Sequence, residues 1–310
     1  MPAIITHHIF GEDIVSELPA GLVKGEEELL AFLLANQGPD PLSARFSTLP
    51  SHSSLCRSLG ARIQGGRVTR TFMRLRDGVA HLPASEERIG RAFALGLLGH
   101  YVLDRTAHPF IVSQQRAIIQ TDRSLAPASR GVHAVIESEL DSWILWEKRR
   151  ATVKDRPVTE NLMRTDRVSR VGGALFSQIG LAVFGIALGA QEYARSVSDY
   201  ETFYRAIEPA GSSRLHAMGQ AERLVRGWSL AEAYAHYVTN ESECPAANLS
   251  CRPWRHPFTD ETRTESFADL FDEARLSYPV LAEAFVRGNE SQIRDFVSGL
   301  NYEGRPGTDL

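Results

Sequence analysis

The sequence predicts an all-α protein, a single-domain bundle of helices over residues 1–310. Two observations predict this class. Most segments between turn residues repeat their apolar side chains at three- and four-residue intervals, which is the period of an α-helix. Alternating runs of convincing strand length are absent from the sequence, and no low-complexity linker divides it into two parts.

Each expected helix has identifiable ends. Residues 24–36 begin with acidic side chains, which favour a helix N-terminus, and end before the breaker Gly38-Pro39. Residues 86–107 are almost wholly apolar and are expected to stop before Pro109, because the residue that precedes a proline is disfavoured in a helix. Further helices are expected over 131–148 and, within a helical C-terminal portion 160–310, near 171–207, 214–239, 264–287 and 289–299. Irregular loops are expected at about 37–55, 110–130, 150–160 and 240–262.

Composition narrows the class of protein. Hydrophobic residues make up 43% and charged residues 23%, so disordered and fibrous classes are excluded. The net charge of −4, without a basic cluster, argues against a nucleic-acid partner. Three cysteines are too few for a disulfide framework, and Cys244 and Cys251 either pair or stay free. No signal peptide is visible at the N-terminus, so a cytoplasmic location is expected.

The segment 171–190 is twenty residues long and carries no charge, which is long enough to cross a bilayer. It also contains Gln178 and five glycines, and it lacks the aromatic and basic residues that flank a membrane span. We therefore expect a buried core helix there and no transmembrane span.

Histidines followed four residues later by an acidic residue occur four times, where chance placement would give about one. One such pair, His100 and Asp104, lies in the most apolar of the expected helices. Four residues advance a helix by about 400°, so the two side chains share one face, and His108 continues the spacing. A buried carboxylate without a partner is costly, so this stripe predicts a divalent cation as the partner.

A second stripe follows on the next expected helix. His133 and Glu137 repeat the spacing, and Asp141 lies one turn further on. If the two helices pack antiparallel, the stripes face each other across one cleft, and zinc takes nitrogen and oxygen ligands of this kind. The alternative is a pair of buried histidine–carboxylate hydrogen bonds without a metal.

Two upstream elements add candidate ligands. Residues His7 and His8 place imidazoles near the start of the chain. Asp40 stands between two prolines in a rigid turn, where it is either a ligand or a turn former. The remaining histidines in helices or loops, His81, His216 and His236, are expected to make ordinary hydrogen bonds.

The motifs together resemble a known family. They are Thr-His-x-x-Phe-Gly from Thr6, Gln-Gly-Pro-Asp from Gln37, Gly-His-Tyr-Val-Leu-Asp from Gly99 with a following His-Pro, and His-x-x-x-Glu from His133. This set resembles the bacterial zinc-dependent phospholipase C family, whose superfamily also holds single-strand-specific zinc nucleases. The later segment Asn-Tyr-Glu-Gly from Asn301 is similar to a stretch in uncharacterised members. The resemblance covers most of the chain, with the ligand motifs within 6–141.

The resemblance implies an all-helical domain that encloses up to three zinc ions, with two expected in this chain. By the resemblance, three ligand sets are implied: Asp40, His100 and Asp104 for one zinc; His108, His133 and Glu137 for a second; and His7, with Asp104 bridging, for a third. Asp40 is also the implied catalytic residue, which accepts the proton of the attacking water.

The chain departs from the family pattern at two places. Secreted members ligate zinc with the amino group of an N-terminal tryptophan, which this sequence lacks. Gln64 stands where the family usually presents a histidine, and His52 is the alternative donor for that place. A glutamine is a poor zinc ligand, so the zinc at Asp40 is expected to bind more weakly than the one at His133.

The activity that the resemblance implies is hydrolysis of a phospholipid head group or another small phosphodiester. A zinc cluster would neutralise charge on the phosphate and lower the pKa of a bound water. Two alternatives remain open at the level of sequence. One is a metal-stabilised helical scaffold that binds without catalysis, and the other is a nuclease of the same superfamily, against which the lack of a basic groove counts.

Overall fold

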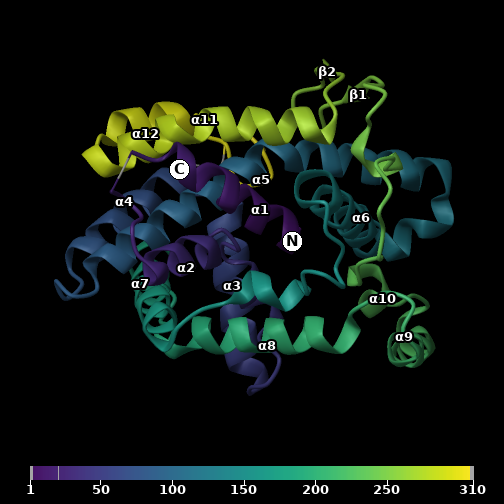
Figure 1. Ribbon diagram of the computed structural model, residues 1–310, viewed down its shortest axis with the longest axis horizontal. Coiled ribbons are helices and arrows are strands. Elements are labelled where there is room, and N and C mark those ends of the chain that lie inside the picture. The colour runs from purple at the N-terminus through teal and green to yellow at the C-terminus, as the bar shows by residue number, and fades with distance from the viewer. Residues whose placement is uncertain (1–2, 20, 308–310) are drawn as a thin grey trace.

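The computed structural model describes residues 3–19 and 21–307, and these residues are mostly helical (Figure 1). The predicted all-α class is confirmed. The α-helices of the described part are α1 (Ile4–Ile14), α2 (Glu26–Ala35), α3 (Pro50–Gly65), α4 (Val68–Ala80), α5 (Glu87–Thr121), α6 (Ser129–Arg149), α7 (Asp166–Phe184), α8 (Gln191–Ile207), α9 (Ser213–Arg226), α10 (Leu230–Tyr234), α11 (Phe267–Arg287) and α12 (Glu290–Val297). Short 3-10 helices are η1 (Val15–Glu17), η2 (Asp40–Ala44), η3 (Arg123–Ala128), η4 (Val158–Leu162) and η5 (Pro245–Ala247). Strands β1 (Trp254–Arg255) and β2 (Thr262–Arg263) form a small antiparallel pair.

Helix α5 is the central element of the fold. Its 35 residues pack against α1, α2, α4, α6, α7 and α11. One hydrophobic core includes residues from Ile4 to Tyr302, so the two ends of the described chain contribute to the same interior. In Figure 1, α11 and α8 lie along opposite sides of the molecule, with α1 and α2 between them.

Two glycines let α2 approach α5 closely. A Cβ on Gly96 would lie 2.1 Å from the carbonyl oxygen of Phe32, and a Cβ on Gly99 would lie 2.5 Å from Oδ1 of Asn36. Only glycine tolerates such a contact, so the two backbones meet there. This close approach carries the carbonyl of Asn36 to the ring of His100.

The expected end of the long helix before Pro109 is wrong. Helix α5 continues through Pro109 to Thr121, so the first half of the expected loop at 110–130 is helical. Proline has no N–H and leaves the carbonyl of Arg105 without its helical partner. Phe110 and Ile111 extend the buried face beyond the proline, and this packing outweighs the lost hydrogen bond.

The expected loop at 37–55 is also partly wrong, because it contains η2 and the first turn of α3. Pro50 occupies the first turn of α3, where a proline costs no hydrogen bond. Helix α1 was not among the expected helices. Its residues are buried on nearly every side, and a helix of that kind shows no amphipathic period.

The uncharged segment 171–190 is helical only as far as Phe184. Helix α7 ends there because Gly185 adopts a left-handed conformation with φ of 67°. Within the ranges that the structure describes, no helix is long and apolar enough to span a membrane. Cys56, Cys244 and Cys251 are all free, so the alternative of a 244–251 disulfide is not realised.

Candidate metal centre

The first group of candidate ligands surrounds the carboxylate of Asp104. Nε2 of His7 lies 3.2 Å from Oδ1 of Asp104, and Nε2 of His100 lies 3.2 Å from Oδ2. The two imidazole rings stack with their centroids 4.1 Å apart. The side chains are 4%, 0% and 13% exposed for His7, His100 and Asp104. The family resemblance implies a bridging role for Asp104, and the structure places its carboxylate between two imidazoles.

The electrostatics of this group depend on the shared carboxylate. Burial alone would lower the pKa of His100, but the charge and hydrogen bond of Asp104 raise it above its usual value. Burial also opposes ionisation of Asp104, yet His100 and His7 outweigh burial and hold the pKa of Asp104 well below its usual value. The carboxylate is therefore ionised, which is the state that a cation requires.

Hydrogen bonds orient both imidazoles of this group. Nδ1 of His100 lies 2.9 Å from the carbonyl oxygen of Asn36, to which it donates, so Nε2 is the atom directed at Asp104. His7 is held through its helix. Asp141 on α6 accepts hydrogen bonds from the backbone N–H groups of Ile5 and Thr6, at 2.9 and 2.8 Å, and thereby caps the N-terminus of α1.

The second group lies one turn further along α5. Nε2 of His108 is 3.1 Å from Nε2 of His133, which in turn is 3.2 Å from Oε1 of Glu137. Burial, and then the neighbouring His133, lower the pKa of His108 to about 3. A neutral His108 keeps a lone pair available for a cation. Nδ1 of His133 lies 3.1 Å from Oε1 of Gln115, which fixes the ring from behind.

Each group fits a divalent cation. The ligand atoms of His7, His100 and Asp104 lie within 4.8 Å of one another, and so do those of His108, His133 and Glu137. Imidazole nitrogens and carboxylate oxygens are the donors that zinc takes in proteins. The Nε2 atoms of His108 and His133 face each other, and two such nitrogens attract only when a proton or a cation lies between them. Two groups that could hold a metal ion are therefore present.

Asp40 lies beside the first group but is not a member of either group among the described residues. Its side chain is buried, and Oδ1 accepts a hydrogen bond of 2.7 Å from Nε2 of Gln64. Gly38 brings the turn to this place, because its φ is 56° and a Cβ there would overlap the ring of His100. Asp40 is near enough for its charge to contribute to the raised pKa of His100. His52 is exposed on α3 and does not complete this site.

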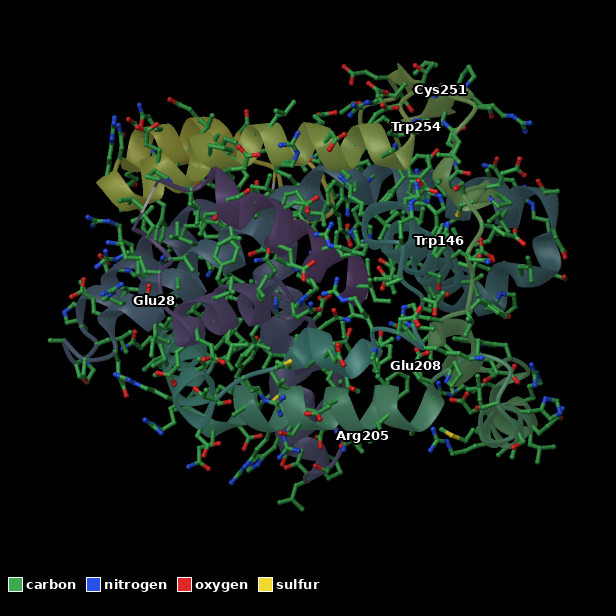
Figure 2. All side chains as sticks on the ribbon, viewed as in Figure 1. Glu28, Trp146, Arg205, Glu208, Cys251 and Trp254 are labelled. Atoms are coloured by element: carbon green, nitrogen blue, oxygen red, sulfur yellow. The ribbon has the colours of Figure 1, made fainter. Side chains whose placement is uncertain are left out.

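A third cluster combines His236, which follows α10, with two carboxylates, Asp141 of α6 and Glu208 just after α8. Nε2 of His236 is 3.1 Å from Oδ2 of Asp141, and Nδ1 is 2.6 Å from Oε1 of Glu208. Burial would lower the pKa of His236, but the two carboxylates raise it to about 9. Figure 2 shows Glu208 beyond the end of α8. The sequence predicts ordinary hydrogen bonding for His236, and these ion pairs agree with that prediction.

Sequence reasoning missed three residues that support the metal centre: Asn36, Gln115 and Asp141 as a helix cap. The sequence spacing could have identified one of these residues. Gln115 lies seven residues after His108, which places the two side chains on the same face of a helix. Asn36 acts through its backbone carbonyl, and no residue type marks such a role.

A groove of about 1200 Å³ lies away from both groups, between the C-terminal half of α5 and the segment 243–260. Figure 2 shows Cys251 and Trp254 at this edge of the molecule. Comparisons with protein-family models, with curated proteins and with solved structures find no match to this chain.

Proposed function

We propose that the chain is a zinc-dependent hydrolase of phosphodiesters that resembles phospholipases C, acting on a small diester or a phospholipid head group. The observation that supports this most is the placement of six donor side chains in two groups on α1, α5 and α6. Asp104 and His108 belong to different groups and lie one helical turn apart on α5. Neighbouring cations at such a spacing suit a phosphate, whose oxygens can contact both.

In this proposal each group holds one zinc ion, through the side chains His7, His100 and Asp104 in the first and His108, His133 and Glu137 in the second. Zinc bound there supplies positive charge to the phosphate and makes a nearby water molecule more acidic. The chain itself fixes the donors. Asn36 and Gln115 occupy the Nδ1 atoms of His100 and His133, which directs both Nε2 atoms to the ligand positions.

Asp40 is the proposed catalytic base. Gln64 holds Oδ1 of Asp40 in place, which leaves Oδ2 to accept a proton from the attacking water. Asp40 is shielded from bulk solvent, because the residue is 3% exposed. Burial followed by neighbouring groups, Asp40 among them, raises the pKa values of Tyr200 and Tyr234. Both phenols therefore stay neutral.

A second candidate is a metal-stabilised helical scaffold that binds a ligand without catalysis. The complete burial of His100 favours it, because a substrate must reach the first group. A cytoplasmic location, which cell fractionation tests, also belongs to the proposal.

Zinc content and hydrolysis separate these functions. We expect about two zinc ions per chain by elemental analysis, and hydrolysis of bis(p-nitrophenyl) phosphate or p-nitrophenyl phosphocholine. His133→Ala is expected to lower the rate by about 100-fold or more, because it removes a ligand. His216→Ala, whose side chain is 69% exposed, is the matched control and keeps the wild-type rate. Zinc binding without hydrolysis of either ester would favour the scaffold, cleavage of single-stranded DNA alone would favour a nuclease, and fewer than about one zinc ion per chain would refute the proposal.

A further inference from the structure

The C-terminal segment 301–305 packs against the first group of candidate ligands. The backbone N–H of Tyr302 donates to the carbonyl oxygen of Gln64 at 3.2 Å, which joins the segment to the end of α3. Oδ1 of Asn301 accepts hydrogen bonds from the backbone N–H groups of Glu303 and Arg305, at 3.0 and 2.9 Å. The asparagine thus forms a closed turn that presents Tyr302 to the interior.

Gly304 fixes this turn on α5. Its φ is 68°, and a Cβ there would lie 2.6 Å from Cγ of Pro109 and 2.7 Å from the carbonyl oxygen of Arg105. That carbonyl is the one that Pro109 leaves without a helical partner. The turn therefore sits on the part of α5 that separates Asp104 from His108, and a side chain at position 304 would push it away.

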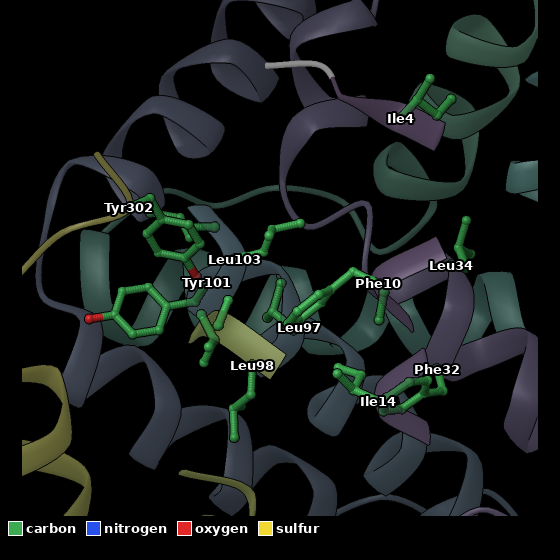
Figure 3. Close-up of a cluster of buried hydrophobic side chains, with 14 of the residues drawn as sticks. Ile4, Phe10, Ile14, Phe32, Leu34, Leu97, Leu98, Tyr101, Leu103 and Tyr302 are labelled. Carbon is green, nitrogen blue, oxygen red and sulfur yellow. The ribbon is translucent and has the colours of Figure 1, made fainter. Parts of the chain in front are cut away.

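Tyr302 projects from this turn into the core. Its ring lies beside that of Tyr101 (Figure 3), with the two centroids 5.0 Å apart. The centroid of the His100 ring is 5.7 Å from that of Tyr302. The residue is 1% exposed, and its hydroxyl has no hydrogen-bond partner within the described chain. Burial first, and then charges that include those of Asp104 and Asp40, raise the pKa of Tyr302 far above its usual value. A phenol hydroxyl can donate one hydrogen bond, so Tyr302 brings a donor to this place.

A buried hydroxyl without a partner costs free energy, and phenylalanine would fill the same space without that cost. Three of the four carboxylate oxygens of Asp104 and Asp40 are already engaged. Both oxygens of Asp104 contact imidazoles, and Oδ1 of Asp40 contacts Gln64. The fourth, Oδ2 of Asp40, is assigned to the attacking water in the proposed function, so a ligand that enters the first group is the acceptor that remains for Tyr302.

We propose that the Tyr302 hydroxyl binds a phosphate oxygen of the ligand at the His7–His100–Asp104 group. This assignment rests on the proposed function, since it takes the ligand to be a phosphate or a phosphate ester. The phenol contributes a directional hydrogen bond to an anionic oxygen, which is stronger than a bond to a neutral acceptor. Tyr302 then selects for a tetrahedral oxyanion at the buried end of the centre.

The test compares the zinc-loaded wild type with Tyr302→Phe, using inorganic phosphate as the probe and calorimetry as the measurement. We expect phosphate affinity to fall about tenfold in Tyr302→Phe, because one hydrogen bond to a charged oxygen is lost. Zinc affinity should stay the same, and the melting temperature should stay the same or rise. Tyr278→Phe is the matched control. Its hydroxyl donates to the carbonyl oxygen of Leu95 at 3.1 Å, so this variant should lose thermal stability and keep wild-type phosphate affinity.

Equal phosphate affinity in wild type and Tyr302→Phe would overturn the assignment, and so would the absence of phosphate binding by the zinc-loaded wild type. A fall in phosphate affinity that is matched by falls in zinc affinity and melting temperature would also overturn it. A wild type that binds no zinc would refute the assignment together with the proposed function. A tenfold loss of phosphate affinity in a protein that hydrolyses no phosphodiester would support the assignment and refute the proposed function.

Discussion

The two candidate metal-ligand groups and the His236 cluster contain the same residue types in similar surroundings, but their atoms are arranged differently. In each metal-ligand group, three donor atoms lie within 4.8 Å of one another. In the His236 cluster, Asp141 and Glu208 contact different nitrogens of one ring, so the two carboxylates lie on opposite edges of the imidazole. The donors of the first two groups converge, and those of the third are separated by the histidine itself.

The engagement of the carboxylates adds a second difference. Asp141 is 0% exposed and also accepts hydrogen bonds from Ile5 and Thr6, so its oxygens are committed to the cap of α1. The two oxygens of Asp104 contact the imidazoles of its own group, one each. The presence of a histidine near two carboxylates is therefore not enough, by residue type alone, to make a metal site. Convergence of the donor atoms on one point is what makes the other two groups candidates for a metal ion.

The largest expected effect is on zinc content, which should depend on the second group and not on the third cluster. His133→Ala removes one of three donors from the second group, and we expect zinc stoichiometry to fall by about one ion per chain. His236→Ala removes a histidine of equal size from the third cluster and should leave the stoichiometry unchanged. Elemental analysis after dialysis measures both. If the folded His236→Ala variant lost zinc, the third cluster would also hold a metal, and the distinction between it and the other two groups would be wrong.

The third cluster should also contribute to the stability of the fold without any metal. His236→Phe leaves Asp141 and Glu208 as buried or half-buried carboxylates without their cation, which typically costs about 3–5 kcal/mol of unfolding free energy. Zinc should not restore that loss, because the variant keeps no convergent donors. Urea denaturation of the variant with and without zinc measures it. Full rescue by zinc is the result that would contradict a purely structural His236.

The pH dependence of stability includes a contribution from the third cluster. The pKa of His236 is raised from 6.5 to about 9 in the folded protein by Asp141 and Glu208 acting against burial. A group whose pKa is raised on folding stabilises fully below its unfolded pKa and loses that contribution as pH rises through its folded pKa. We expect the unfolding free energy to fall by roughly 3 kcal/mol between pH 6.5 and pH 9.5.

The matched control for the pH profile is His236→Phe, since the difference between the two profiles cancels the other titrating groups. Denaturation curves at half-unit intervals would provide it. Parallel profiles for wild type and variant would show that His236 does not carry the dependence.

The sequence predicts much of this arrangement because helical period is a local property. The spacing of His100, Asp104 and His108 places them on one stripe, and the structure keeps that stripe on α5. The all-α class follows from the same periodicity. Features that are local in the chain could be predicted, including the stripe of donors on α5.

Features that depend on contacts distant in sequence were not predictable from the chain. The continuation of α5 through Pro109 depends on packing of Phe110 and Ile111 against the rest of the core. The pairing of His7 with His100 depends on how Asp141 holds α1 against α6, over a separation of more than a hundred residues. Asp40 was grouped with His100 through the family resemblance, and its contact with Gln64 gives it a different immediate neighbour.

The smallest expected effect concerns Gln64, whose amide donates to Oδ1 of Asp40 at 2.7 Å. In the family that the chain resembles, a histidine usually stands at this place. An imidazole nitrogen is a stronger zinc donor than an amide oxygen, so Gln64→His adds a donor next to the first group. We expect about a tenfold gain in zinc affinity there, measured by calorimetric titration, with the second group unchanged.

His52→Ala is the control and should have no effect, because His52 is exposed on α3. The backbone carbonyl of Gln64 that accepts from Tyr302 is kept in the variant, so the C-terminal turn stays in place. An unchanged titration in Gln64→His would show that Asp40 and residue 64 lie outside the reach of the first metal, which would leave His7, His100 and Asp104 as its complete set of protein ligands.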